Sequence, residues 1–416
     1  MRNNRLFLSY FLTIILERLK IRTHSIFSQA TLVRNFILKE KTSADVETES
    51  EVDREVQDLD EKGETYSKSG VDIIEEGEAI EEIWKMLPKT FNLNPNAKFL
   101  PALAHYGGIV DIGMPDKYLV VTVDGVGSKV LIAEMLEKFD TVGIDCVAMN
   151  VNDLICVGAQ PLVFVDYYAI EKPDTDMARQ IAKGLVDGAI QSRMAVIGGE
   201  TATLPDIIRG HAGKGFDLAG TAVGIVDKDK LVLGDKITSD DIIIGIESNG
   251  LHSNGYSLAR KVLLEEHSVN DEIEGIHIGK ALLEPTLIYV QEILEIIEKA
   301  KIHGLANITG GAFLKLARLM RQSKTPIGVH LDSMPEPLPI FKLIQKLGNV
   351  SDKEMYKTFN MGIGFCIIAP ESEFETISQI CQKHGKKTYK IGKVIPEKKI
   401  ILEVAGEKIE YPADKY

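Results

Sequence analysis

Apolar residues follow two alternating spacings along the chain from about residue 65 onward. Short runs rich in Val, Ile and aromatic residues predict buried strands, and apolar positions three to four residues apart predict helices that cover them. The predicted strands of the first half lie at 118–123, 162–168, 195–197 and 217–226. The predicted helices cover 141–158, which ends at Gly158, and 174–192.

A charged stretch at 227–230 interrupts this pattern, and we place a domain boundary there. Beyond it, strands are predicted at 241–246, 326–331, 363–368 and 398–403, and helices at 255–266 and 284–300. Strands and helices do not alternate strictly, which favours an α+β fold built of α/β layers over a Rossmann sheet. We therefore expect one domain at 65–229 and a second α/β domain at 230–416.

The first 64 residues differ from the rest in charge. Residues 1–41 hold eight Lys/Arg against two acids, and residues 42–64 hold ten acids against two bases. These segments carry +6 and −8, so the remainder carries −11 of the total −13. The acidic stretch is poor in apolar residues, which is typical of a disordered or loosely helical linker. We interpret 1–64 as an extension outside the fold; organelle targeting by 1–41, which contains an apolar run at 6–16, is the alternative.

Composition narrows the class of protein. The 416 residues are 44% hydrophobic and 26% charged, as in globular proteins, and no apolar run reaches the length of a membrane span. With a net charge of −13, a nucleic-acid partner is not expected. Four scattered cysteines lack metal-ligand spacing and suggest a reducing compartment, the cytoplasm; they are Cys146, Cys156, Cys366 and Cys381.

The first candidate site is the segment DGVGSK at 124–129, which follows a predicted strand. Asp124 at a strand end is placed to hold Mg²⁺, and Gly125 and Gly127 would let the backbone approach a phosphate. Lys129 could neutralise phosphate charge. An isolated Asp-Gly pair is, however, more often ordinary turn chemistry.

Two further carboxylates strengthen the metal hypothesis. Asn152 and Asp153 share one face of an otherwise apolar helix with Asp145, so they form either a buried polar network or a metal and phosphate site. Glu200, in the segment GGETA at 198–202, follows a strand and would complete a Mg²⁺ site with Asp124 and Asp153.

A third segment, LHSNGYS at 251–257, precedes a predicted helix. Ser253 or Asn254 would cap this helix, whose N-terminus could bind an anion. His252 could donate a hydrogen bond to a substrate or act in proton transfer. The glycine-bearing loops at 308–313 and 359–364 are, individually, ordinary turns.

Eight segments in one order resemble the phosphoribosylformylglycinamidine cyclo-ligase family, the aminoimidazole ribonucleotide synthetases of purine biosynthesis. The resemblance covers about 65–403. The segments are YSKSGVDI at 66–73, DGVGSK at 124–129, GIDCVAMNVND at 143–153, GGETA at 198–202, HSNGYS at 252–257, EPT at 284–286, ITGG at 308–311 and MYKTFNMGIG at 355–364.

The resemblance implies a two-domain fold, with N-terminal sheets that join across a homodimer. It implies Mg²⁺-dependent use of ATP to phosphorylate the formyl oxygen of formylglycinamidine ribonucleotide, after which a nitrogen closes the imidazole ring. Catalysis then depends chiefly on positioning and electrostatics.

The resemblance also assigns roles to residues of this chain. Asp124, Asp153 and Glu200 match acidic positions at the ATP and Mg²⁺ end of the site, and His252 matches a histidine near substrate and phosphates. The other positions it marks as catalytic or nucleotide-binding are Lys68, Gly125, Gly127, Lys129, Asn152, Asn254, Thr309 and Gly310.

Three positions depart from the family pattern. Leu287 stands where arginine is usual, Asn307 where histidine is usual, and Ala312 where a third glycine is common. These changes affect the expected ribose-phosphate contacts. The alternatives are another ATP-using enzyme of the superfamily, such as selenophosphate synthetase, thiamine-monophosphate kinase or a hydrogenase-maturation protein, or a nucleotide-binding protein without activity. Selenophosphate synthetase would need a reactive cysteine near its N-terminus, and 60–110 contain none.

Overall fold

The computed structural model describes residues 63–70, 73–91, 93–100 and 106–412. The predictions for the extension, except its last two residues, and for a targeting segment at 1–41 lie outside the described residues. Residues 62–416 form one compact unit. Among the helices that the structure describes, none is both long and apolar enough to cross a bilayer.

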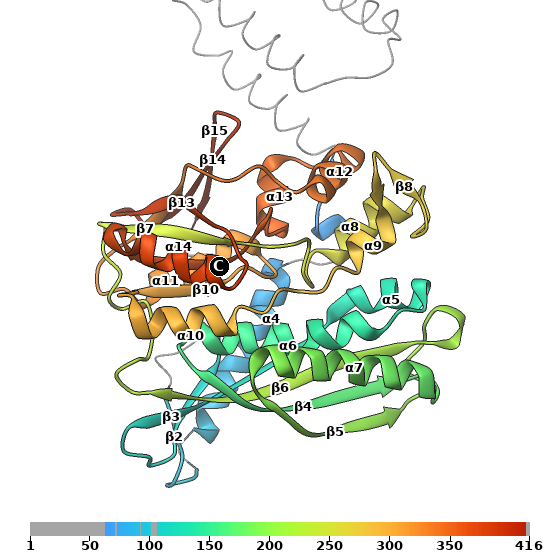
Figure 1. Ribbon diagram of the computed structural model, residues 1–416, viewed down its shortest axis with the longest axis horizontal. Helices are drawn as coiled ribbons and strands as arrows, with labels where there is room; N and C mark the ends of the chain where they lie inside the picture. The colour runs from blue at the N-terminus through green and yellow to red at the C-terminus, as the bar shows by residue number, and fades with distance from the viewer. Residues whose placement is uncertain (1–62, 71–72, 92, 101–105, 413–416) are drawn as a thin grey trace, which may run out of the picture. The chain divides into compact units, whose positions relative to one another are not determined.

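A six-stranded sheet forms the first layer, in the order β1-β2-β3-β6-β4-β5 (Figure 1). Among the described strands of this sheet, neighbours pair antiparallel except β4 and β5, which run parallel. The strands are β1 (Lys98–Phe99), β2 (Gly108–Asp111), β3 (Lys117–Gly125), β4 (Gln160–Ile170), β5 (Ala195–Thr203) and β6 (Phe216–Asp227).

Helices cover one face of this sheet. α6 (Asp140–Ile155) packs on β3, β4 and β6, next to α7 (Thr175–Ser192), and α5 (Val130–Leu136) packs on β6. The two long helices approach closely at Gly143, because a Cβ there would lie 2.4 Å from the Ile181 carbonyl oxygen. Asp174 caps α7 by accepting hydrogen bonds from two backbone amides of its first turn.

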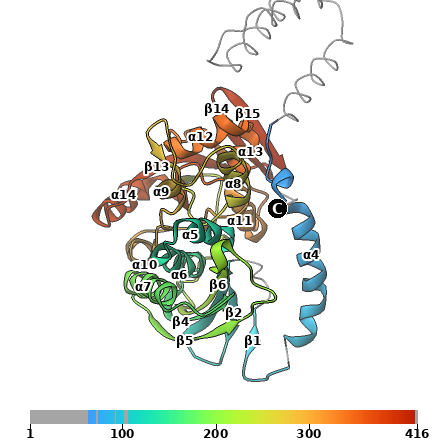
Figure 2. The ribbon, with the colours of Figure 1, turned by 90° about the vertical axis from the view of Figure 1, so that its right-hand side faces the viewer.

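A second, seven-stranded sheet has the order β10-β12-β7-β13-β11-β14-β15, in which the described pair β11–β14 is parallel. Its strands are β7 (Asp241–Glu247), β10 (Gly304–Asn307), β11 (Gly328–Leu331), β12 (Ile363–Pro370), β13 (Thr388–Ile395), β14 (Lys399–Val404) and β15 (Glu407–Pro412). Around it lie α8 (Tyr256–Leu264), α9 (Ile278–Leu282), α10 (Val290–Lys299), α11 (Leu316–Gln322), α12 (Pro339–Gly348), α13 (Asp352–Thr358) and α14 (Phe374–Lys383). α4 (Ile73–Met86) runs along the edge of this unit (Figure 2).

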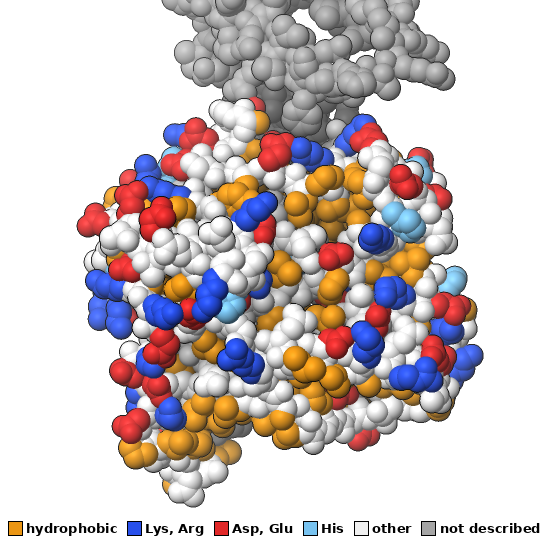
Figure 3. All heavy atoms as spheres, in the orientation of Figure 1, with side chains coloured by type: hydrophobic (Ala, Val, Ile, Leu, Met, Phe, Trp, Pro, Cys, Tyr) orange, Lys and Arg blue, Asp and Glu red, His pale blue; other side chains and the backbone are white. Residues whose placement is uncertain are grey.

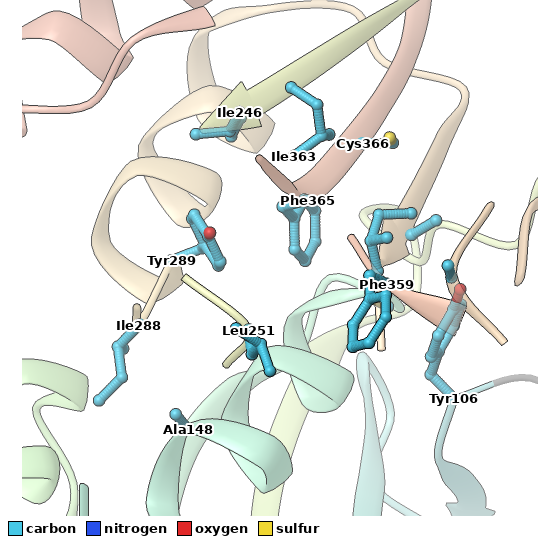
Figure 4. Close-up of a cluster of buried hydrophobic side chains, with 14 of the residues drawn as sticks. Tyr106, Ala148, Ile246, Leu251, Ile288, Tyr289, Phe359, Ile363, Phe365 and Cys366 are labelled. Carbon is cyan, nitrogen blue, oxygen red and sulfur yellow. The ribbon is translucent and has the colours of Figure 1, made fainter. Parts of the chain in front are cut away.

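A continuous apolar core joins the two sheet layers. Leu251 and Tyr289 lie between Ala148 of α6 and Phe365 of β12, and the Tyr289 and Phe365 ring centroids are 5.4 Å apart (Figure 4). α10 packs on both α6 and α7. The polar residues that interrupt this core are therefore the ones whose partners need explanation.

Most predicted elements are confirmed in type, and two are wrong in extent. The strand predicted to break at Gly198 continues to Thr203, because β5 pairs with β4 along that whole length. The helix predicted from 284 begins only at Val290. The residues before it, 284–289, form neither helix nor strand, and their backbone groups bind side chains of the first domain.

Candidate active site

Lys129 lies fully buried between the two layers, and its ammonium group is saturated. Its Nζ donates to Asp145 at 2.9 Å, to the His252 carbonyl at 3.0 Å and to the Glu284 carbonyl at 2.6 Å. Asp145 also accepts from the backbone and the hydroxyl of Thr286, at 2.8 and 2.6 Å. An ammonium has three protons, so Lys129 has no donor left for a phosphate. The geometry assigns Lys129 to holding the layers together, not to the phosphate contact expected from sequence.

Asn152 makes the same kind of connection about two helical turns along α6 from Asp145. Its Nδ2 donates to the Leu287 carbonyl at 2.8 Å, and its Oδ1 accepts from the Tyr289 backbone at 3.0 Å. The Leu287 side chain departs from the family pattern, but the hydrogen bond from Asn152 is to the Leu287 backbone carbonyl. Asn152 thus belongs to the buried network that the sequence offered as its alternative interpretation.

Asp124 and Asp153 lie near each other and form an acidic pair. Burial raises the pKa of Asp153 to about 6, and the neighbouring charge of Asp124 adds to this rise. Burial likewise raises the pKa of Asp124. Asn307 Nδ2 donates to Asp153 at 2.8 Å, so the asparagine that replaces the usual histidine orients this carboxylate. Two partly buried carboxyls with no direct ion pair to any described residue suit a divalent cation.

Two cations that sequence reasoning missed reach this pair from the second domain. Lys315 ends the short helix η6 (Ala312–Lys315), and Arg318 follows in α11. Burial raises the pKa values of Asp124 and Asp153, and the charges of Lys315 and Arg318 oppose that rise. Burial, and next the charge of Arg318, lowers the pKa of Lys315 to about 8. The available signal was two basic residues three apart, directly after the ITGG loop.

His252 is 1% exposed and held in the left-handed region at φ 61°. Neither ring nitrogen hydrogen-bonds to any residue that the structure describes. Burial, helped by the charge of Lys129, lowers the His252 pKa to about 3. The imidazole is therefore neutral at physiological pH, so it can donate one hydrogen bond and accept one, but it is not a proton-carrying acid.

The residues after His252 do not cap α8, whose N-cap is Gly255 without a side-chain bond. The predicted cap was wrong because Ser253 Oγ instead donates to the Val126 carbonyl at 2.6 Å, which fixes the loop against the DGVGSK segment and Gly127. Asn254 faces Gly310, where a Cβ would lie 3.1 Å from its Oδ1. Thr309, next to it, is buried.

Glu200 lies apart from the acidic pair. Asp124 aligns across the sheet with Gly220, Asp166 and Gly199, so Glu200 falls in the next row, on the opposite face. Three strand spacings separate β3 from β5, about 14 Å. No three His, Cys, Asp or Glu side chains gather as a metal-binding group anywhere in the described residues. The proposed triad of Asp124, Asp153 and Glu200 is therefore not assembled within this unit.

Lys68 lies near the start of the described residues, and the cysteines lie in the core. Lys68 lies in η1 (Ser67–Ser69), and its Nζ donates to the Gly63 carbonyl at 2.8 Å. The short stretch around it is held by an ion pair of Glu64 with Lys261 at 2.5 Å. The four cysteines are buried free thiols, and burial raises the pKa of each one, which is typical of unreactive core thiols.

Comparison with known proteins places this arrangement in one family. Residues 105–226 match the model of the AIR synthase related protein N-terminal domain, and residues 238–405 match the C-terminal domain. Phosphoribosylformylglycinamidine cyclo-ligase of Pyrococcus horikoshii is 48% identical over 334 residues, which cover 80% of this chain and 96% of the relative. That of Methanocaldococcus jannaschii is 46% identical over 351 residues, which cover 83% and 95%.

Solved structures share the fold at low identity. HypE in the HypE–HypF complex superposes with a TM-score of 0.57 at 17% identity, covering 80% of this chain and 98% of the other. ThiL complexed with AMPPCP and TMP gives a TM-score of 0.57 at 16% identity, covering 80% and 94%. At these identities the likeness concerns the fold alone. The expected two-domain fold is confirmed.

Proposed function

Because the chain belongs to the AIR synthase related family and to its phosphoribosylformylglycinamidine cyclo-ligase branch, we propose that it converts formylglycinamidine ribonucleotide to aminoimidazole ribonucleotide with consumption of ATP. The observation that carries this proposal is the near full-length match, at 46–48% identity, to relatives named for this activity. The site supports it, because two partly buried carboxylates and a neutral histidine lie beside the glycine segments.

The reaction needs two steps at one place. The formyl oxygen of the substrate attacks the γ-phosphorus of ATP, and ADP leaves with the bridging oxygen. A substrate nitrogen then attacks the formyl carbon. Phosphate departs with the electron pair of the C–O bond, and one proton is released. Nothing here requires a protein nucleophile, so the work of the site is positioning and charge compensation.

The residues divide this work by their chemistry. Asp124 and Asp153 fit a Mg²⁺ ion, which would supply positive charge at the phosphate oxygens when bound. Neutral His252 can donate a hydrogen bond to the substrate, and Asn254 with Gly310 forms a polar, backbone-accessible edge. Lys129 and Asn152 keep the two layers in register around these groups.

The activity is tested directly with purified protein, Mg²⁺, ATP and formylglycinamidine ribonucleotide. We expect one ADP and one aminoimidazole ribonucleotide per turnover, followed by coupled ADP detection and by chromatography of the ribotide. ADP release should fall to background without the ribotide, since phosphoryl transfer needs its formyl oxygen. Equal ADP release with and without the ribotide would contradict the assignment.

We also propose a homodimer that joins through the open face of the first sheet. Figure 1 shows helices on one side of β3, β4, β5 and β6 and none on the other. Val123, on that open face, is 75% exposed, and Ile197 of β5 is 63% exposed. Apolar area of this kind on a sheet is usually covered by another molecule. Glu200 lies on the same face, so a second copy is what could bring further groups near it.

A charge placed on this face should break the dimer. We expect Val123→Lys to run as a monomer in light scattering after gel filtration, because burying an unpaired ammonium in an apolar interface is costly. Leu347→Lys, at another partly exposed apolar position, is the control and should remain dimeric. An unchanged dimer in Val123→Lys would place the interface elsewhere.

We place the reaction in the cytoplasm, without a nucleic-acid or membrane partner. The buried free thiols suit a reducing compartment. The face drawn in Figure 3 intersperses Lys and Arg with Asp and Glu instead of gathering one sign of charge. That face offers no basic stripe for a phosphate backbone.

A further inference from the structure

Lys315 is a partly buried cation whose charge has no direct partner. Its Nζ makes no hydrogen bond or ion pair with any residue described in the structure, whereas Lys129 makes three hydrogen bonds. Removing an ammonium from water without a counter-charge is unfavourable. A side chain held this way on a folded surface suits a ligand that brings the missing negative charge.

The groups around Lys315 indicate the class of ligand that it would bind. The same turn that carries it begins at β10, where Asn307 bonds Asp153, and passes Gly310, which faces Asn254. Burial raises the pKa values of Asp124 and Asp153 and the charge of Lys315 opposes that rise, yet Lys315 pairs with neither carboxylate. A phosphate with its metal ion suits two carboxylates and an ammonium. The metal ion would bind the carboxylates, and the phosphate oxygens would bind the ammonium.

We propose that Lys315 is a catalytic residue that binds the γ-phosphoryl oxygens of ATP during transfer, the role that Lys129 cannot take. Arg318 holds a second positive charge beside it, with its guanidinium carbon 5.0 Å from the centre of the Tyr106 ring. This inference rests on the proposed function, since it concerns the phosphoryl group consumed by that reaction.

The chemistry asks little of Lys315 beyond its charge. The bond from the γ-phosphorus to the β,γ-bridging oxygen breaks, and its electron pair leaves with ADP. The new bond joins the γ-phosphorus to the formyl oxygen. Negative charge is shared by the three equatorial oxygens in between, and a fixed ammonium stabilises it without gaining or losing a proton.

Nucleotide affinity separates this role from a structural one. We expect Lys315→Met to weaken binding of the ATP analogue AMPPNP about 10- to 100-fold, the effect of losing a charge-assisted hydrogen bond, and to leave ADP binding unchanged. Turnover should fall by about 100- to 1,000-fold. Lys315→Arg should recover part of the AMPPNP affinity and part of the turnover, because arginine restores the positive charge. Calorimetry with Mg²⁺ present measures the affinities.

The control is Lys324→Met, which removes an exposed lysine just beyond α11 and should behave as the parent. Lys315→Gln repeats the test if the methionine variant does not fold. Equal loss of AMPPNP and ADP binding, or no loss of either, would overturn the role of Lys315. These binding results do not depend on cyclisation, so inactivity of the parent protein towards the ribotide would refute the proposed function separately.

Discussion

Replacing Lys129 with methionine is expected to lower the free energy of unfolding by about 3–5 kcal/mol, the usual result of removing one partner from a buried ion pair. The variant would leave Asp145 buried with a full charge, stabilised only by Thr286. It would also leave the carbonyls of His252 and Glu284 without their donor. A loss of this size is a large fraction of a typical protein's stability.

Urea denaturation of parent and variant measures this difference. The matched control is Lys138→Met, which removes an ion pair of similar length, 2.6 Å to Asp140, at an exposed position. Surface pairs contribute about 0–1 kcal/mol, so this control should unfold almost as the parent does. If Lys129→Met kept its stability and lost only ATP turnover, Lys129 would be a phosphate ligand after all.

The elements of the fold were predictable where apolar spacing alone decides them. Apolar residues alternate or follow one another over most of β3 and β6. In α6 and α7, apolar residues recur every three to four positions. The glycines in β5 favoured a break, but pairing with β4 decided the outcome. Residues 284–289 have helical spacing, yet their backbone is bound by Lys129 and Asn152 from more than 130 positions away. Distant partners of this kind leave no local signal.

The site was predictable in its carboxylates and not in its lysines. Asp124 and Asp153 stood out because acids inside apolar segments need a reason. A lysine near glycines gives the same sequence signal whether its ammonium is saturated, as at 129, or open to a ligand, as at 315. Only the three acceptors around Lys129 distinguish the two. Glu200 was grouped with the acids by motif, but strand register puts it on the other face.

The division of roles between two lysines explains how an acidic protein can bind an anionic substrate. The net charge of −13 opposes ATP, so attraction must come from charge fixed inside the site. Lys129 forms an ion pair with Asp145 and joins the two layers. Lys315 keeps its charge available, and the second domain carries it to the acidic pair of the first. Correct docking of the two domains is therefore a condition for phosphate binding.

Asp153→Asn is expected to reduce turnover by about 100-fold or more, because a neutral amide is a poor Mg²⁺ ligand and charge compensation is the main work of the site. The change should not harm the fold, since the amide oxygen can still accept the Asn307 hydrogen bond. Steady-state rates at several Mg²⁺ concentrations check this, and high Mg²⁺ should recover part of the loss. Asp116→Asn, in an exposed loop, is the control.

Asp153→Asn should lower turnover but raise stability, so the two measurements distinguish a role in the site from a role in the fold. Folding raises the pKa of Asp153 from 3.8 to about 6, so the stability that its protonated form contributes is lost as pH rises through 6. A permanently neutral asparagine avoids that loss. Without Mg²⁺, Asp153→Asn should therefore be more stable than the parent above pH 6, and the difference should shrink towards pH 4. A variant that is less stable and less active at pH 7 would instead mark Asp153 as structural.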